Sequence, residues 1–330
     1  MDRRGFFARS LSGGAALAAA PLARARATRS PRPEALGLLY DSTLCIGCKA
    51  CVAACKREND MLADHAPGVE KMWDTPLDLS GRTLNVIKVY REGGAREKDV
   101  EKDGYAFIKK SCMHCVDPSC VSACPVSAMT KDRVSGIVRY SEEACIGCRY
   151  CVAACPFGVP RFTFDRAYPK ISKCQLCQHR LGEGKFAACA EVCPTGATLY
   201  GPVADLKQEI TRRRALPPGT RTTFPRGRIG SGDTYVGTVA RYVDHVYGEK
   251  EIGGTQVIHL SGVPFELLNK PQLPDIAPAS ISESVQHAIY YNLIAPVGFL
   301  GVLAGLAFRH MQPAPEPAAG PQAKGDGGES

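Results

Sequence analysis

The sequence predicts an α+β fold, in which short helices and strands surround clustered cysteines, followed by an irregular extension and one C-terminal transmembrane helix. Three observations lead to this prediction. Sixteen cysteines fall into four groups between residues 45 and 193. The eleven residues 45–55, CIGCKACVAAC, recur at 145–155 as CIGCRYCVAAC with two changes. Near the C-terminus, residues 289–308 carry no charge and are long enough to cross a bilayer.

The N-terminal residues 1–27 have the features of an export signal. Arg3 and Arg4 precede two phenylalanines, an apolar run follows at 11–22, and Ala25-Arg26-Ala27 offers the small residues that a signal peptidase requires. The run is rich in alanine and glycine, which is typical of a twin-arginine signal. An ordinary secretory signal or a basic terminus is the alternative. A twin-arginine signal would export the chain folded, with its cofactors already installed.

The net charge of +8 does not point to a nucleic-acid partner. Five arginines in residues 1–27, against one aspartate, account for +4 of it. The remaining +4 is spread over about 300 residues, which is too sparse for an anion-binding surface. We therefore expect no nucleic acid among the partners.

The cysteines have the spacing of iron–sulfur ligands. The first and third groups read C-x2-C-x2-C-x3-C, and the last cysteine of the second, third and fourth groups precedes proline. Disulfides are the first alternative, but thiols two residues apart are poorly placed to crosslink each other. Structural zinc is the second, but it gives no reason for a third cysteine or for the proline. We therefore expect four [4Fe–4S] clusters, which use all sixteen cysteines.

The pairing of the groups follows from the ligand exchange of bacterial ferredoxins. There, three closely spaced cysteines hold one cluster and the fourth reaches its neighbour. The adjacent second and third groups are expected to form one pair, and the first and fourth groups the other. The predicted ligands are Cys45, Cys48, Cys51 and Cys193 for site 1; Cys55, Cys174, Cys177 and Cys189 for site 2; Cys112, Cys115, Cys120 and Cys155 for site 3; and Cys124, Cys145, Cys148 and Cys151 for site 4.

The chain is thus expected to contain a double ferredoxin-like region at 28–204 and a docking extension at 205–283. Within them we expect a small strand at 136–140, a helical turn at 152–154 and a surface helix at 205–216, which is rich in lysine and arginine and is ended by two prolines.

A transmembrane helix is expected at 284–310, with Ile289 to Phe308 as its span and Tyr290 and Tyr291 at the interface. Arg309 follows the span, whereas the preceding side lacks lysine and arginine, so the C-terminus is expected in the cytoplasm. The alternative is a buried core helix, which Asn292 and Pro296 favour. Residues 311–330 are expected to be disordered.

Four polar side chains near these motifs are candidate functional residues. His114, within the second group, is expected to tune a cluster through a hydrogen bond, since that group already has four thiols. Lys49 and Arg149 lie inside the repeats, where their charge would raise a cluster potential or simply be solvated. His287, just before the span, is expected to be interfacial. No general base, nucleophile or substrate pocket is evident, so no catalytic residue is predicted.

The chain resembles the four-cluster ferredoxin-type beta subunits of dimethyl-sulfoxide reductase and formate dehydrogenase. It is most similar to the iron–sulfur subunit of hydrogenase-2-type membrane-bound [NiFe] hydrogenases. The likeness covers nearly the whole chain and rests, besides the cysteines, on Leu39–Leu44, Gly104–Ala106, Met113–Pro118, Ser231–Tyr235, Tyr247–Lys250 and Gly253–Val257.

This resemblance implies an electron-transfer subunit on the periplasmic side of the inner membrane. Its expected partners are the small and large subunits of a [NiFe] hydrogenase and a multi-span, quinone-reactive membrane subunit. Hydrogen oxidation would then be coupled to quinone reduction. The alternative from the same architecture is the iron–sulfur subunit of a molybdopterin oxidoreductase or formate dehydrogenase. A non-redox zinc protein is the alternative from a different class.

Overall fold

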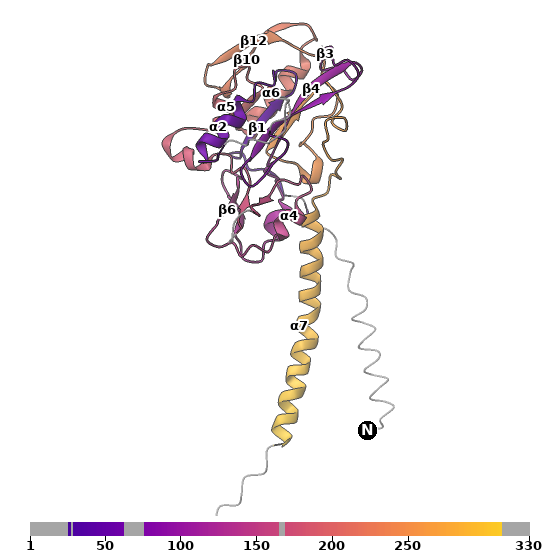
Figure 1. Cartoon of the computed structure of the whole chain (residues 1–330). Coiled ribbons are helices and arrows are strands. Elements are labelled where there is room, and N and C mark those ends of the chain that lie inside the picture. The colour runs from indigo at the N-terminus through magenta and orange to yellow at the C-terminus, as the bar shows by residue number, and fades with distance from the viewer. Residues whose placement is uncertain (1–25, 28, 63–75, 165–168, 312–330) are drawn as a thin grey trace, which may run out of the picture. The chain divides into compact units, whose positions relative to one another are not determined.

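A computed structural model describes residues 26–27, 29–62, 76–164 and 169–311 (Figure 1). The predicted signal, apart from Arg26 and Ala27, lies outside the described residues, as does the predicted tail beyond Met311. The chain divides into a unit of residues 25–283, here called the cysteine unit, and a second unit to which residues 284–311 belong.

A four-stranded mixed sheet forms the centre of the cysteine unit. Its order is β11-β9-β1-β13, with β1 antiparallel to β9 and parallel to β13. The strands are β1 (Leu36–Asp41), β9 (Thr198–Pro202), β11 (Gly227–Arg228) and β13 (Val257–Leu260). At Gly37 a Cβ would lie 2.0 Å from the carbonyl oxygen of Gln256, so only glycine lets β1 and β13 approach this closely.

Helix α6 (Val203–Ala215) packs on this sheet through one apolar face. Leu206 and Ile210 join Leu39, Leu199 and Ile258 in a buried cluster. The predicted helix at 205–216 is therefore confirmed, although it is not wholly a surface helix. Its inner face also buries Arg213, whose side chain has no exposed area.

A second sheet lies against the first, in the order β2-β4-β3. Its strands are β2 (Asn85–Arg91), β3 (Glu97–Lys98) and β4 (Gly104–Ser111). The hydroxyl of Tyr40 in β1 donates to the carbonyl of Phe107 in β4 at 3.0 Å, which ties the two sheets together across the core. Both residues belong to the largest hydrophobic cluster of the unit.

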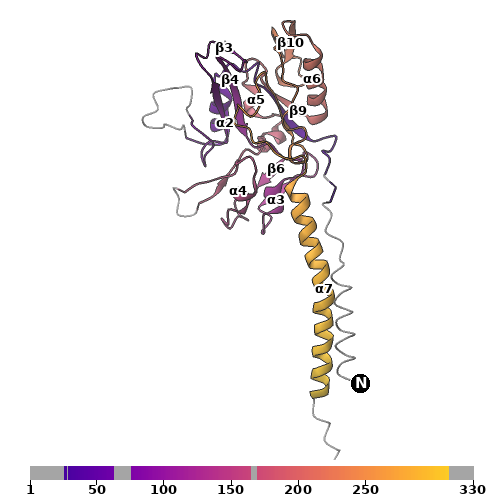
Figure 2. The ribbon, with the colours of Figure 1, turned by 90° about the vertical axis from the view of Figure 1, so that its right-hand side faces the viewer.

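Short hairpins and helices complete the cysteine unit. The hairpins are β5 (Met129–Lys131) with β6 (Val138–Tyr140), β7 (Arg161–Phe162) with β8 (Ile171–Ser172), and β10 (Arg221–Pro225) with β12 (Thr234–Thr238). The helices are α2 (Ala50–Glu58), α3 (Ser119–Ser122), α4 (Tyr150–Ala154) and α5 (Ala188–Glu191), with 3-10 turns at Gln178–Glu183 and Glu251–Gly253. Helix α2 contacts α5, and α3 contacts α4. Figure 2 shows α3, α4 and β6 together at one end of the unit.

The segment expected to be an irregular extension shares the core of the cysteine unit. Residues 205–283 supply most of α6, the hairpin β10–β12 and the strand β13, which is hydrogen-bonded to β1. The predicted strand at 136–140 is confirmed as β6, and the helical turn at 152–154 as part of α4.

Helix α7 (Pro278–Met311) is 34 residues long and includes the predicted span. It is the one helix in the described ranges that is long and apolar enough to cross a membrane, with a mean hydropathy of 1.8 and no buried residue in its apolar window. Pro296 lies inside it. By length and composition, α7 is a candidate membrane span.

Candidate metal centres

The structure brings together the four predicted ligands of site 1 and those of site 4. One cavity is lined by Cys45, Cys48, Cys51 and Cys193, and another by Cys124, Cys145, Cys148 and Cys151. In both cases three cysteines come from a helix N-terminus and the turn before it, and the fourth comes from the C-x3-C-P segment of another group. All sixteen cysteines lie in described parts of the chain and are free thiols.

The thiols of sites 2 and 3 lie close enough to perturb one another. Burial raises the pKa of the Cys115 thiol well above its usual value, and the thiolates of Cys112, Cys120 and Cys155 raise it further. These are the four predicted members of site 3.

For site 2, burial likewise raises the pKa of the Cys174 thiol, and the thiolates of Cys55, Cys177 and Cys189 add to the effect. Four anionic thiolates in one apolar site repel one another, so each site favours binding of a positively charged group among the thiolates.

Neighbouring sites also influence one another, which gives their order. Burial raises the pKa of Cys51 in site 1 to about 12, and Cys189 of site 2 contributes to that rise. Cys112 of site 3 contributes to the raised pKa of Cys174 in site 2. Burial also raises the pKa of Cys120 in site 3 to about 12, and Cys151 of site 4 contributes. The sites therefore follow one another as 1, 2, 3, 4.

The repeated segments adopt the same left-handed turn at both ends of this series. Lys49 and Arg149, which precede α2 and α4, have φ of 57° and 63°, and Gly47 and Gly147 have φ of 70° and 73°. These turns curl the backbone around the thiols. The guanidinium of Arg149 also stacks over Phe162, with 5.2 Å to the ring centre.

Backbone N–H groups point at several of the sulfurs. The amides of Met129 and Thr198 donate to Cys124 Sγ and Cys193 Sγ, each at 3.4 Å and each from five residues further along the chain. Such bonds favour the thiolate and tune the potential of whatever the sulfur binds. The two related C-P segments therefore carry the same bond, one at site 4 and one at site 1.

Lys109 is a buried cation that the motifs did not reveal. It lies in β4 with 1% of its surface exposed, and its Nζ donates to the hydroxyl of Thr198 at 3.3 Å. Burial alone would lower its pKa, but the thiolates of Cys189 and Cys51 raise it above its usual value. The cation thus compensates negative charge between sites 1 and 2. The only local signal was that Lys109 directly follows the apolar run Ala106–Ile108 in this strand.

His114 is fully buried and uncharged. Its Nδ1 accepts the amide of Val138 at 3.1 Å, while its Nε2 has no partner among the described residues. Burial is the main cause that lowers its pKa well below the usual value. This hydrogen bond is thus made to the backbone and not to a cysteine, and the expected tuning of a cluster stays a prediction. His287 is an exposed residue on α7.

Exposure distinguishes the ends of the series from its middle. Cys48 of site 1 and Cys148 of site 4 are exposed, whereas the cysteines of sites 2 and 3 are buried or half-buried. The isoleucine within each repeat, Ile46 or Ile146, is 54% or 66% exposed beside them. Sites 1 and 4 therefore each have one exposed cysteine, whereas sites 2 and 3 have none.

The thiols are arranged for a group larger than one ion. Within the described ranges, no three or more His, Cys, Asp or Glu side chains converge on a point that would hold a single metal ion. A structural zinc would need four ligands about 2 Å from one centre. Cavities lined by four cysteines, as at sites 1 and 4, suit a [4Fe–4S] cube, which is held at its corners.

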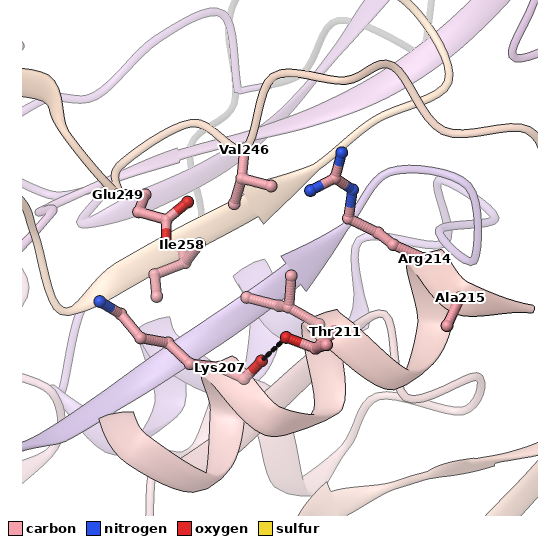
Figure 3. Close-up of a pocket in the computed structure, with 8 residues that line it drawn as sticks. Lys207, Thr211, Arg214, Ala215, Val246, Glu249 and Ile258 are labelled. Atoms are coloured by element: carbon pink, nitrogen blue, oxygen red, sulfur yellow. Dashed lines mark hydrogen bonds between the residues drawn. The ribbon is translucent and has the colours of Figure 1, made fainter.

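Two further cavities are not lined by cysteine. One lies between α6 and β13, where Lys207, Arg214 and Glu249 surround its opening (Figure 3). The other is a wide hollow of about 1450 Å³, counting space open to solvent, next to Pro156 and Lys270. Neither contains the thiols on which the predicted chemistry depends.

Comparison with known proteins also indicates iron–sulfur clusters. Models of the 4Fe-4S dicluster domain match residues 37–125 and 104–202. The Hydrogenase-2 operon protein HybA of Escherichia coli O157:H7 is 46% identical over 312 residues, which cover 93% of this chain and 94% of the relative. Two iron–sulfur subunits of Escherichia coli K12 are more distant. The subunit of formate dehydrogenase-O is 32% identical over 86% of both chains, and that of the nitrate-inducible formate dehydrogenase is 31% identical over 83% of both. The chain therefore belongs to the family of iron–sulfur proteins with 4Fe-4S dicluster domains that includes the Hydrogenase-2 operon protein and the formate dehydrogenase iron–sulfur subunits.

Proposed function

We propose that this chain relays electrons through four [4Fe–4S] clusters, from the small subunit of a [NiFe] hydrogenase to a quinone-reactive integral membrane subunit. The observation that carries the proposal is the series of four thiol sites, of which the two end sites each have an exposed cysteine and the two middle sites have none. Such a series suits a relay, because electrons enter at one exposed end and leave at the other.

The residues around the sites have the roles that a relay requires. When bound, a [4Fe–4S] cluster accepts and releases single electrons. The thiolates hold it, and the amides of Met129 and Thr198 stabilise the sulfurs. Lys109 offsets the negative charge between sites 1 and 2, while the apolar core around them keeps water away.

The hydrogenase partner is favoured over a molybdopterin enzyme by the degree of similarity. The relative with 46% identity is named for hydrogenase-2, whereas the formate dehydrogenase subunits are 31–32% identical. Both alternatives use the same cysteine framework, so the spacing of the thiols does not separate them. The electron donor separates them, because it is hydrogen in one case and formate in the other.

The apolar surface of α7 supports attachment to the inner membrane. Large side chains such as Ile294, Val297 and Phe308 are 63–75% exposed, which a water-soluble protein would bury. Gly301 and Gly305 leave one stripe of the helix bare, where a helix of the multi-span subunit can pack closely. With Arg309 in the cytoplasm and the proposed twin-arginine signal, the cysteine unit lies on the periplasmic side.

The proposal is tested on the complex purified without oxygen. About sixteen irons per chain are expected, four for each cluster, and low-temperature EPR should show that hydrogen reduces them. Stoichiometric zinc with little iron would end the proposal. Reduction by formate and not by hydrogen would select the alternative partner.

The ligand exchange is tested with three serine variants. Cys48→Ser removes a ligand that the first group contributes to site 1. Cys193→Ser should cause the same spectral loss, because Cys193 lines the same cavity. Cys189→Ser, which belongs to site 2, is the matched control from the same group. If Cys193→Ser instead reproduced the spectrum of Cys189→Ser, the exchange would be wrong.

A further inference from the structure

Arg26 joins three distant parts of the chain at the edge of the cysteine unit. Its Nη1 and Nη2 donate to the two carboxylate oxygens of Asp117, at 2.5 and 2.8 Å. Its Nε donates to Glu283 Oε2 at 2.8 Å. Asp117 lies between two predicted ligands of site 3, and Glu283 lies in the second turn of α7. The guanidinium therefore ties the beginning of the chain to a metal site and to the candidate membrane helix.

The carboxylate of Asp117 depends on this contact. Its side chain is 1% exposed, and within the described ranges Arg26 is the charged group that hydrogen-bonds to it. A buried carboxylate without a partner is strongly unfavourable, and a two-pronged contact from arginine is the strongest that a side chain offers. Arg26 therefore stabilises the loop 115–120 by pairing with the buried carboxylate that this loop contains.

This requirement conflicts with the signal boundary expected from the sequence. Cleavage after Ala27 would remove Arg26 together with the signal and leave Asp117 unpaired. The same pattern of small residues occurs two positions earlier, as Ala23-Arg24-Ala25. Cleavage after Ala25 would retain Arg26 at the start of the exported chain.

We propose that the signal peptidase cuts between Ala25 and Arg26, so that Arg26 is the first residue of the mature protein and part of its fold. Water is added across the peptide bond, which leaves a carboxylate on Ala25 and a free amine on Arg26. The proposal rests on the export signal of the proposed function, but not on the hydrogenase partner or the quinone.

Arg29 provides the natural comparison. Its Nη2 lies 3.6 Å from Glu283 Oε2, and its side chain is 53% exposed, against 25% for Arg26. The structure shows no contact between Arg29 and Asp117. Removing either arginine deletes one positive charge from the same stretch of chain, but only Arg26 satisfies the buried carboxylate.

The first test is the N-terminal sequence of the protein purified from membranes with its complex. Arg26 at the first position is expected. A chain that begins at Thr28 or later would overturn the proposal, and so would one that begins before Arg26, since it would show a different cut. This result does not depend on whether hydrogen reduces the clusters, so the proposal and the relay function can fail separately.

The second test compares Arg26→Gln with Arg29→Gln in the full complex. The readout is the rate at which the visible absorbance of the clusters is lost at a fixed raised temperature. We expect Arg26→Gln to accelerate the loss about tenfold, since an unpaired buried carboxylate weakens the loop of site 3. Arg29→Gln should change the rate less than about twofold, because its contact is long and exposed. Equal rates for the two variants would overturn the structural role of Arg26.

Discussion

Replacing Arg213 by methionine should open the interface between α6 and β1. The side chain has no exposed area, and it pairs with Asp41 at 2.8 Å and with Glu209 at 2.7 Å. Methionine keeps much of the packing against Phe224 but removes the charge. Breaking a buried ion pair costs about 3–5 kcal/mol. Since the hydroxyl of Tyr242 still donates to Asp41 at 2.8 Å, we expect the lower value, about 3 kcal/mol, which is about 100-fold in an opening equilibrium.

Hydrogen exchange followed by mass spectrometry measures this opening without complete unfolding. Amides of α6 and β1 should exchange about 100-fold faster in Arg213→Met than in the unaltered chain. Arg212→Met is the matched control, because Arg212 pairs with Glu209 at 2.7 Å from a side chain that is 40% exposed. Such an exposed pair contributes at most about 1 kcal/mol, so its loss should speed amide exchange by about fivefold at most. If both variants exchanged equally fast, the buried charge would not be the cause and the reasoning would be refuted.

Two further predictions concern a buried histidine and the glycines of the repeat. His259 has no exposed area, and burial is the main cause that lowers its pKa well below the usual value, with Lys270 and Lys109 adding to the effect. The imidazole stays neutral in the folded chain, whereas in the unfolded chain it is protonated below about pH 6.5. The free energy of unfolding therefore falls as the pH drops below that value, by up to about 1.4 kcal/mol per pH unit. His259→Leu should reduce that dependence in guanidinium unfolding followed by cluster absorbance, and an unchanged slope would contradict the assignment. The second prediction uses the repeat, because Gly47 and Gly147 both have a left-handed φ but lie in different surroundings. A Cβ at Gly47 would lie 2.4 Å from the ring of Phe107, whereas a Cβ at Gly147 would meet nothing nearer than 3.8 Å. Gly47→Ala should therefore release iron from site 1 faster than Gly147→Ala releases it from site 4, and equal rates would count against the clash.

The cysteines that line the cavities of sites 1 and 4 could be predicted, because the information is local or repeated. Spacing within each group identifies three thiols that one turn presents together, and the proline after a fourth marks the ligand that leaves for a neighbour. The cavities of sites 1 and 4 contain the predicted cysteines for this reason. The helix at 203–215 also follows from its composition and the two prolines that end it, and the long apolar helix at the C-terminus follows from its length.

The surroundings of the sites could not be predicted, because they depend on pairings between distant segments. Nothing near β1 indicates that Leu38 will lie opposite Val257, and strand register is decided by the assembled core. The partners of Lys109 and Arg213 come from other elements for the same reason. Arg26 was assigned to a cleaved signal because its sequence context is that of a signal, whereas its contact with Asp117 exists only in the fold.

The position of β1 between β9 and β13 affects the order in which the chain can be completed during synthesis. The strand leaves the ribosome among the first residues to be made, yet its neighbours are 198–202 and 257–260. The cavity that contains Cys45 is likewise incomplete until Cys193 has been synthesised. Sites 3 and 4, in contrast, draw only on cysteines between residues 112 and 155. The thiols synthesised first are therefore among the last to obtain their full set of partners.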